Sequence, residues 1–279
     1  MTLAPDISAT KTELLKERYG NLFNLDAPWN RTLSELLSHR SIRAYLSKSL
    51  PSGTLELLVA AAQSAATSSN LQTWSVVAVE DQARKERLSQ LAGGQAHIRQ
   101  SPLFLVWLAD LARPTHIAES RDLPHEGLSY LETFLTAAID ASLAAQNAVV
   151  AAESLGLGTA YIGGIRNNPE EVAAELNLPK NVFAVFGLCV GYADPAQSTA
   201  IKPRLPQKAV LHREHYRIDA QDDAIEQYNQ VMKDFYTEQK MNVAGDWTQH
   251  SSDRIATPES LRNRANLRQI LNNLGFELR

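Results

Sequence analysis

The feature that most constrains the fold is an uninterrupted apolar run at Val182–Val190. Because this run has no polar face, it fits a strand that is buried on both faces of a sheet. Shorter apolar segments at Trp74–Val79 and Leu103–Ala109 predict two more strands, and Thr159–Ile165 is also strand-like. Together with the helices described next, these segments predict a single α+β body.

Helix patterns alternate with the predicted strands. The longest covers Leu128–Leu155, and its many alanines indicate close packing on more than one side, which suits the centre of a dimer. The segment Ala112–Gly127, which is rich in Pro, His and Arg, is predicted to be a loop. The other predicted helices are Lys11–Tyr19, Leu55–Ala66, Asp81–Ala92 closed by Gly93-Gly94, one that starts at Asn168-Pro169, Ala224–Tyr236, and a last one that begins near Thr257-Pro258.

Composition and charge narrow the class of protein. Of the 279 residues, 44% are hydrophobic and 21% are charged, as in an ordinary globular protein. The net charge of -4 disfavours a nucleic-acid partner, and the most apolar stretch, Leu103–Ala109, is too short to span a membrane. A single cysteine allows no internal disulfide, so we expect a soluble cytoplasmic protein. Residues 1–30 are predicted to be an N-terminal extension of one domain at 31–279.

Two basic clusters are candidates for binding a phosphate. In the segment Ser38–Arg43, Arg40 and Arg43 are three residues apart and would share one face if the segment were helical. A solvated basic turn explains this segment equally well. The second cluster, Lys202-Pro203-Arg204, follows a buried strand, and its proline aims two cations in a fixed direction. Taken alone, it is more often an ordinary surface loop.

Two further segments suit a flat heteroaromatic ring. Tyr161-Ile162-Gly163-Gly164 ends a strand, and paired glycines allow a ring to approach the backbone closely, although a turn with positive φ is the more common explanation. The polar run Thr67–Gln72 offers hydroxyls and amides to the edge of a ring, although such runs more often cap a helix. Considered together, the four segments predict a phosphorylated planar ligand such as FMN.

The order of several motifs resembles that of a known family. The motifs are SHRSIRAY, ATSSNLQ, GGQAH, SLGLGTAYIGGIRNNPEEV, FGLCVGYA and IKPRLP. They are similar to those of the oxygen-insensitive NADPH nitroreductases and related flavin reductases, from about Leu33 to the C-terminus. The resemblance implies an α+β fold, a three-layer α/β/α sandwich with a mainly antiparallel central sheet. It also implies an intertwined homodimer in which both subunits contribute to FMN sites at the interface.

The same resemblance assigns FMN contacts residue by residue. No side chain is assigned a catalytic role, because FMN itself transfers the hydride, and no metal is implied. Lys202 and Arg204 are the candidates for positive charge near the flavin and its phosphate. The implied FMN-binding residues are His39, Arg40, Ser41, Ile42, Arg43, Thr67, Ser69, Gln72, Gln95, Ala96, His97, Tyr161, Ile162, Gly163, Gly164, Lys202 and Arg204.

The implied activity is ping-pong hydride transfer from NADPH or NADH through flavin N5 to nitroaromatics, quinones or related small electron-poor acceptors. One alternative is a flavin reductase that supplies reduced FMN to a monooxygenase. Another is a flavin-binding regulator with little turnover. NADPH-dependent relatives have an arginine-containing loop where residues 237–246 contain only Lys240 as a basic residue, so NADH is also a candidate donor. Cys189 lies inside the apolar run and is predicted to be a core thiol.

Overall fold

The computed structural model describes residues 10–20 and 25–279. These residues form two compact units. The first comprises the described residues up to Arg40 together with Ser198–Leu261, and the second comprises Ser41–Gln197 together with Arg262–Arg279. The second unit contains the sheet, and each unit is described separately below.

The sheet of the second unit has four strands in the order β1-β2-β4-β3, and every neighbouring pair is antiparallel. All four strands occur where the sequence predicted them, which confirms an α+β fold. The third is shorter than expected, because its chain turns into a 3-10 helix at Gly163–Asn167. The strands are β1 (Trp74–Val79), β2 (Leu103–Asp110), β3 (Gly158–Ile162) and β4 (Val182–Gly191).

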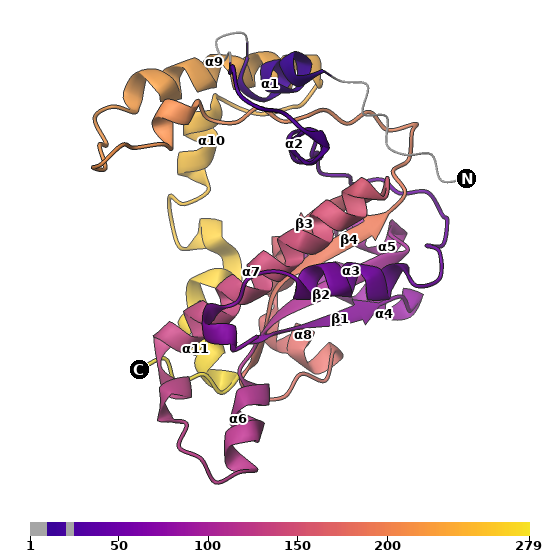
Figure 1. The fold of residues 1–279 in the computed structure, drawn as a ribbon, viewed down its shortest axis with the longest axis vertical. Helices are drawn as coiled ribbons and strands as arrows, with labels where there is room; N and C mark the ends of the chain where they lie inside the picture. The colour runs from indigo at the N-terminus through magenta and orange to yellow at the C-terminus, as the bar shows by residue number, and fades with distance from the viewer. Residues whose placement is uncertain (1–9, 21–24) are drawn as a thin grey trace. The chain divides into compact units, whose positions relative to one another are not determined.

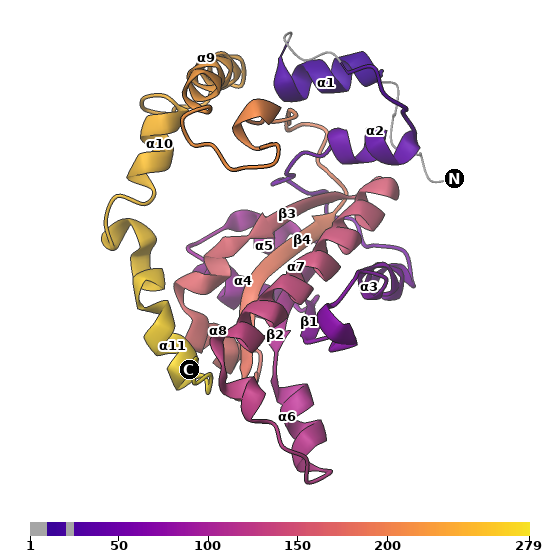
Figure 2. The ribbon, with the colours of Figure 1, turned by 60° about the vertical axis from the view of Figure 1, so that its left-hand side comes forward.

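Helices cover both faces of this sheet, which gives three layers (Figures 1 and 2). Helices α3 and α7 pack on one face, and α4, α5 and α8 lie on the other. The helices of the second unit are α3 (Thr54–Gln63), α4 (Gln82–Leu91), α5 (Ala96–Gln100), α6 (Ala112–Glu119), α7 (Leu131–Ser154), α8 (Pro169–Glu175) and α11 (Leu267–Asn273).

Strand β4 is apolar at almost every position because both of its faces are covered, and it also contains a β-bulge. Trp107 of β2 pairs with Phe186, whereas Leu108 pairs with Ala184, so Val185 is an extra residue on β4. The bulge reverses which side successive residues face. Ala184 therefore joins the core beneath α4 and α8, whereas Leu188, four residues later, joins the core beneath α7.

Helix α7 is the core helix of the second unit. Its buried positions are mostly alanines, such as Ala141, Ala145 and Ala148, which let it lie close to the sheet and to α3. The helix is long and apolar enough to cross a membrane by length and composition alone. Its alanine face is buried against the sheet and against α3.

Two predictions about the secondary structure are wrong, one on a loop and one on the start of the last helix. The segment predicted as a loop at Ala112–Gly127 contains helix α6, whose first turn is fixed by the Asp110 carboxylate accepting from the Arg113 amide at 3.1 Å. Near the C-terminus, the final helix α11 begins ten residues after Thr257, because Arg262 adopts a positive φ of 57° and interrupts the chain of turns at Glu259–Asn266.

The first unit is helical. Helix α1 forms where it was predicted and begins with a capping box, in which Thr10 and Glu13 satisfy each other's backbone amides. Helices α2 and α10 were not predicted, although Asp246 caps α10 by accepting from the Gln249 amide at 2.9 Å. The helices of the first unit are α1 (Lys11–Tyr19), α2 (Arg31–Leu37), α9 (Asp222–Glu238) and α10 (Trp247–Asp253).

Candidate functional site

The segment that contains Arg40 and Arg43 is not helical. Helix α2 ends before it, and Ser41 forms an isolated parallel bridge with Thr159 of β3. The Ile42 amide donates to the Thr159 carbonyl at 2.8 Å, so the chain continues the edge of the sheet. The expectation that the two arginines share a helical face is therefore wrong.

Ile42 can offer only its backbone to a ligand. Its side chain is buried in the core, and a Cβ at Gly158 would lie 2.5 Å from it, so this glycine is required for the packing. The Tyr45 hydroxyl donates to the Ile42 carbonyl at 2.7 Å and fixes the segment from its other end. The neighbouring side chains of Ser41 and Arg43 are exposed.

The polar run Thr67–Gln72 is a tightly held loop. Ser69, Asn70 and Gln72 have positive φ values of 48°, 56° and 51°, which non-glycine residues adopt only when their surroundings enforce it. The Gln72 amide donates to the Thr67 hydroxyl at 2.9 Å and closes the loop on itself. The side chains of Ser69 and Gln72 remain exposed.

Asp140 holds this loop from the direction of helix α7. The carboxylate is buried and accepts from the Thr67 hydroxyl at 2.8 Å and from the Ser68 amide at 3.1 Å. It also accepts from the amide and hydroxyl of Thr73, at 3.2 and 3.1 Å. Four donors therefore converge on one carboxylate, as a buried charge requires.

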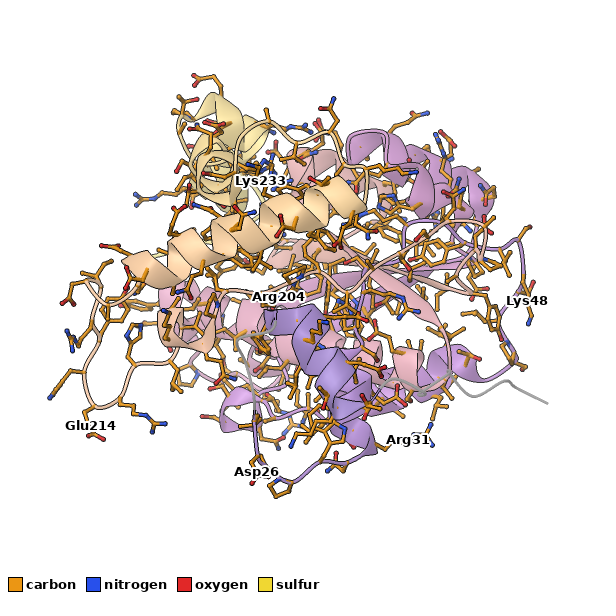
Figure 3. All side chains as sticks on the ribbon, turned by 90° about the horizontal axis from the view of Figure 1, so that it is seen from above. Asp26, Arg31, Lys48, Arg204, Glu214 and Lys233 are labelled. Carbon is orange, nitrogen blue, oxygen red and sulfur yellow. The ribbon has the colours of Figure 1, made fainter. Side chains whose placement is uncertain are left out.

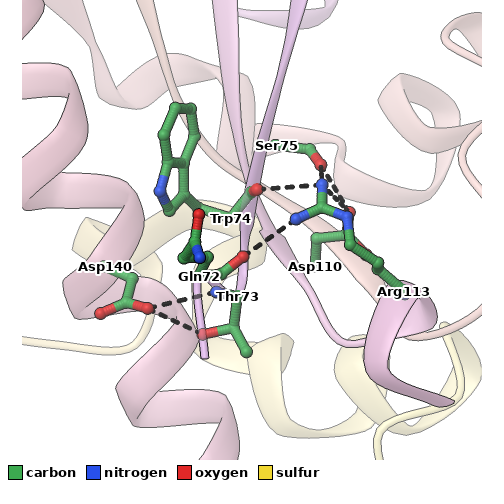
Figure 4. Close-up of polar contacts among 7 residues, drawn as sticks. All are labelled: Gln72, Thr73, Trp74, Ser75, Asp110, Arg113 and Asp140. Carbon is green, nitrogen blue, oxygen red and sulfur yellow. Dashed lines mark hydrogen bonds and ion pairs between the residues drawn. The ribbon is translucent and has the colours of Figure 1, made fainter. Parts of the chain in front are cut away.

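Arg113 of α6 holds the same loop from the opposite side (Figure 4). Its guanidinium donates to the Gln72 carbonyl at 2.9 Å and to the Trp74 carbonyl at 3.2 Å. It also contacts the Ser75 hydroxyl and the Asp110 carboxylate, the latter at 3.2 Å. The conformation that presents Gln72 therefore depends on two side chains that no motif indicated.

Gln95, Ala96 and His97 lie at the start of helix α5. The Gln95 side-chain amide donates to the Ala92 carbonyl at 2.8 Å, so part of its hydrogen-bonding capacity is used within the unit. Partial burial, with the positive charge of Arg43 as the second cause, lowers the pKa of His97 below its usual value. His97 is therefore neutral at pH 7.

The two glycines after β3 have different surroundings. A Cβ at Gly164 would lie 2.2 Å from the Gln95 side-chain amide and 2.4 Å from the Ala92 carbonyl, whereas a Cβ at Gly163 would meet its first neighbour, Arg166, at 3.5 Å. Neither glycine has a positive φ. Gly164 therefore serves the packing of the unit, and only Gly163 leaves room for a ring. The side chain of Ile162 is buried and that of Tyr161 is exposed.

The first unit carries the other predicted cations. Lys202 and Arg204 are exposed on either side of the buried Pro203. The Arg204 guanidinium donates to the carbonyls of Lys202 and Pro203 at 3.0 and 3.2 Å. Arg40 donates to the Thr199 hydroxyl at 3.2 Å. His39, the remaining predicted residue of this unit, is half-buried.

Within each unit taken by itself, these groups match a part of FMN. The cations of the first unit match a phosphate, the hydroxyls and amides at Thr67–Gln72 match the polar edge of a flavin, and Gly163 leaves space beside the backbone. A cavity of about 820 Å³ lies elsewhere in the second unit, around Lys48 and Lys85, and no predicted FMN contact lines it.

Models of one family match most of the chain. The nitroreductase family model matches residues 36–192, and the model of the nitroreductase family C-terminal domain matches residues 202–279. The chain is 38% identical over 250 residues to an FMN reductase (NADPH) of Bacillus subtilis, which covers 88% of this chain and 98% of that protein. It is 39% identical over 220 residues to an oxygen-insensitive NADPH nitroreductase of Salmonella typhimurium, covering 78% and 88% of the two chains.

Solved structures agree with this similarity. The structure of NfrA2 from B. megaterium superposes with a TM-score of 0.83 at 39% identity and covers 90% of this chain and all of that one. The structure of an NADPH:FMN oxidoreductase from Vibrio harveyi complexed with NAD+ superposes with a TM-score of 0.78 at 34% identity, with the same coverage.

Proposed function

The chain belongs to the nitroreductase family and is an FMN-dependent NAD(P)H oxidoreductase, and from that premise we propose which residues hold the flavin and which acceptors it serves. When bound, FMN would supply the redox chemistry, hydride transfer between a nicotinamide and a second substrate. The side chains of this chain bind, orient and electrostatically stabilise the flavin.

In the second unit, we assign the ring contacts to the loop at Thr67–Gln72 and to the end of β3. The side chains of Ser69 and Gln72 are exposed on a backbone that the Gln72 amide closes onto Thr67, so they can donate to the polar edge of the ring with little loss of backbone entropy. Gly163 provides a close approach to the backbone. We assign further contacts in this unit to Ser41, Arg43, Thr67, Gln95, Ala96, His97 and Tyr161, and to Ile42, Ile162 and Gly164 through their backbone only.

In the first unit, we assign the charge contacts to Lys202 and Arg204, together with Arg40 and His39. A cation near flavin N1 stabilises negative charge that develops on the ring, and a guanidinium binds phosphate through paired hydrogen bonds. Lys202→Ala should therefore lower both the affinity for FMN and the rate of reduction. If Lys202→Ala leaves both unchanged, this assignment is wrong.

For the electron acceptor, we propose nitroaromatics, quinones and related planar compounds in a ping-pong cycle. Free FMN is a second candidate acceptor, because two of the Bacillus subtilis relatives are named FMN reductases. Relative kcat/KM values with a nitro compound, a quinone and free FMN distinguish these roles. An enzyme with negligible turnover on all of them would favour a flavin-binding regulator.

We also propose that NADH serves as a donor alongside NADPH. A hollow of about 480 Å³ beside the loop 237–246 is lined by the carboxylates of Glu226 and Asp246 and by one cation, Lys233. Carboxylates repel the 2′-phosphate that distinguishes NADPH from NADH. The measurement is the ratio of kcat/KM for the two nucleotides, and a ratio strongly in favour of NADPH would contradict the proposal.

The assembly we propose is a cytoplasmic homodimer. Four apolar residues of α7, spaced four apart, are each about half exposed and form one stripe. They are Leu131, Leu135, Ile139 and Leu143. A stripe of this kind on a soluble protein usually marks an interface between subunits.

We further propose residues 31–279 as the FMN-binding domain and residues 1–30 as its extension.

The first experiment is an anaerobic reduction of the purified protein. We expect an oxidised flavin spectrum that is bleached by NADH, NADPH or both. A colourless protein that takes up no added FMN would refute the assigned flavin contacts. A yellow protein that neither nucleotide bleaches would retain the flavin contacts but contradict the proposed donors.

A further inference from the structure

We propose that helix α1, in the N-terminal extension, is part of the FMN-binding apparatus because its Arg18 holds the phosphate-binding segments in place. This inference rests on the FMN assignment above. Arg18 does not itself contact the ligand; it is a positioning residue that acts through the backbone of Lys202, Arg204 and His39. All of these residues lie in the first unit.

The Arg18 guanidinium joins two segments that are far apart in sequence. One terminal nitrogen donates to the Lys202 carbonyl at 2.9 Å. The other donates to the carbonyls of Leu37 and His39, each at 2.8 Å. The side chain therefore bridges the chain before Arg40 and the chain that carries the second pair of cations.

The backbone of Arg18 contributes a fourth contact. Its carbonyl accepts from the Arg204 amide at 2.8 Å, so α1 is bonded to Lys202 through the side chain and to Arg204 through the main chain. Figure 3 shows Arg204 beside α1. Main-chain bonds at both residues fix where their exposed side chains begin, and this limits the directions in which the two cations can point.

The burial of Arg18 indicates that this arrangement is rigid. Only 5% of the residue is exposed, and a buried guanidinium is tolerated only where its N–H groups find acceptors. A planar fork spanning three carbonyls suits arginine and cannot be reproduced by the single ammonium group of lysine.

Helix α1 is itself firmly anchored. Leu14 and Leu15 are buried beside Arg18 on the same helix, and the Lys11 ammonium donates to the Ala27 carbonyl at 2.8 Å while lying over the Trp29 ring. The nitroreductase family model matches residues 36–192, so α1 lies outside the matched range. The extension thus adds a support to a site whose ligand contacts belong to the family domain.

The test compares FMN with riboflavin, which lacks the phosphate. Apoprotein is titrated with each flavin for the wild type, Arg18→Ala and Arg18→Lys. We expect Arg18→Ala to weaken FMN binding about tenfold or more and riboflavin binding by less than about twofold, because the oxidised ring is neutral and only the phosphate presents a negative charge to the positioned cations. Arg18→Lys should fall between the wild type and Arg18→Ala, since it keeps the charge but not the fork.

Lys16→Ala is the matched control, because Lys16 is an exposed cation on the same helix. Its ratio of FMN to riboflavin affinity should equal that of the wild type. An unchanged ratio in folded Arg18→Ala or Arg18→Lys would overturn the inference while leaving the FMN assignment intact. A wild type that does not bind FMN would instead refute the proposed function.

A measurement on the unaltered protein covers the case in which the variants do not fold. If α1 supports the phosphate-binding segments, binding energy must be shared reciprocally, so FMN must slow amide hydrogen exchange in Lys11–Tyr19 more than riboflavin does. Equal exchange in this helix with both flavins, at saturation, would also overturn the inference.

Discussion

Gly163 and Gly164 are neighbours at the end of β3, yet substitution should affect them differently. A Cβ at Gly164 would overlap Gln95 and Ala92, so Gly164→Ala should lower the free energy of unfolding by about 1–3 kcal/mol. Gly163→Ala meets only ordinary contacts and should change it by less than about 0.5 kcal/mol. Urea unfolding of the apoprotein measures both values.

FMN titration of the same pair tests the proposed ring contact. Gly163→Ala should weaken FMN binding although the protein remains stable, because the added methyl group occupies space that we assign to the ring. Normal FMN affinity in Gly163→Ala would remove Gly163 from the site. Normal stability in Gly164→Ala would show that the packing around Ala92 can yield.

His97 should make stability depend on pH. Its folded-state pKa is lowered from 6.5 by burial and by Arg43, so the unfolded chain takes up a proton first as the pH falls. Above about pH 6.5 His97 therefore has no effect, and below it the free energy of unfolding decreases until the lowered folded-state pKa is reached. His97→Gln should show a shallower decrease between pH 7 and pH 5 in urea unfolding.

The control for this titration is His116→Gln, because His116 is exposed on α6. His116→Gln should show the same decrease in the free energy of unfolding between pH 7 and pH 5 as the wild type. If His97→Gln and His116→Gln give the same pH dependence as the wild type, His97 does not contribute to the acid sensitivity.

At the scale of elements, the sequence predicted those whose signal is local. The apolar runs identified β2 and β4, and the glycine pair after α4 does adopt positive φ, at 92° and 76°. Helices α6 and α10 were missed because neither contains a buried residue; an aspartate carboxylate accepts from a first-turn amide of each, Asp110 in α6 and Asp246 in α10. The β-bulge in β4 could not be predicted from the sequence, because both faces of the sheet are apolar and a shift from one face to the other does not change the residue type.

The loop at Thr67–Gln72 should depend on Asp140 of α7. In Asp140→Asn, one carboxylate oxygen becomes an amide nitrogen that faces a donor, so at least one buried hydrogen bond is lost. We expect the free energy of unfolding to fall by about 1–3 kcal/mol and FMN affinity to fall with it. Urea unfolding and FMN titration measure these effects.

A control substitution on the same helix distinguishes the loss of the loop contacts from the general effect of a substitution on α7. Ser142→Ala alters an exposed side chain whose hydroxyl donates within α7, at 2.7 Å to the Ala138 carbonyl. It should leave both stability and FMN affinity near the wild-type values. Equal losses in Asp140→Asn and Ser142→Ala would contradict a specific role for the loop contacts.

At the scale of the whole molecule, motifs identified the candidate FMN-binding residues, but they did not identify the side chains that hold those residues in place. Arg18 and Asp140 act through carbonyls, amides and hydroxyls far away in sequence, and such contacts have no sequence period. Asp140 gave a weak sequence signal, because it is a single acidic residue in the apolar stretch of α7. No sequence signal indicated the role of Arg18, because basic residues are common on a charged helix such as α1.

The exposed stripe of α7 allows a direct test of the proposed dimer. In a two-fold interface each residue occurs twice, so the double variant Leu135→Glu with Ile139→Glu places four carboxylates in one contact. Like charges repel and their desolvation is costly, so we expect this variant to sediment as a monomer where the wild type sediments as a dimer. Ile117→Glu on α6, equally exposed but outside the stripe, should remain dimeric.

The same variants test whether the flavin site is shared between subunits. If both subunits contribute contacts, as the family resemblance implies, the monomeric variant must lose FMN affinity although its own candidate residues are unchanged. A monomer that binds FMN as tightly as the wild type would place the whole site within one chain. A wild type that is already monomeric, or a double variant that stays dimeric, would exclude the α7 stripe as the interface.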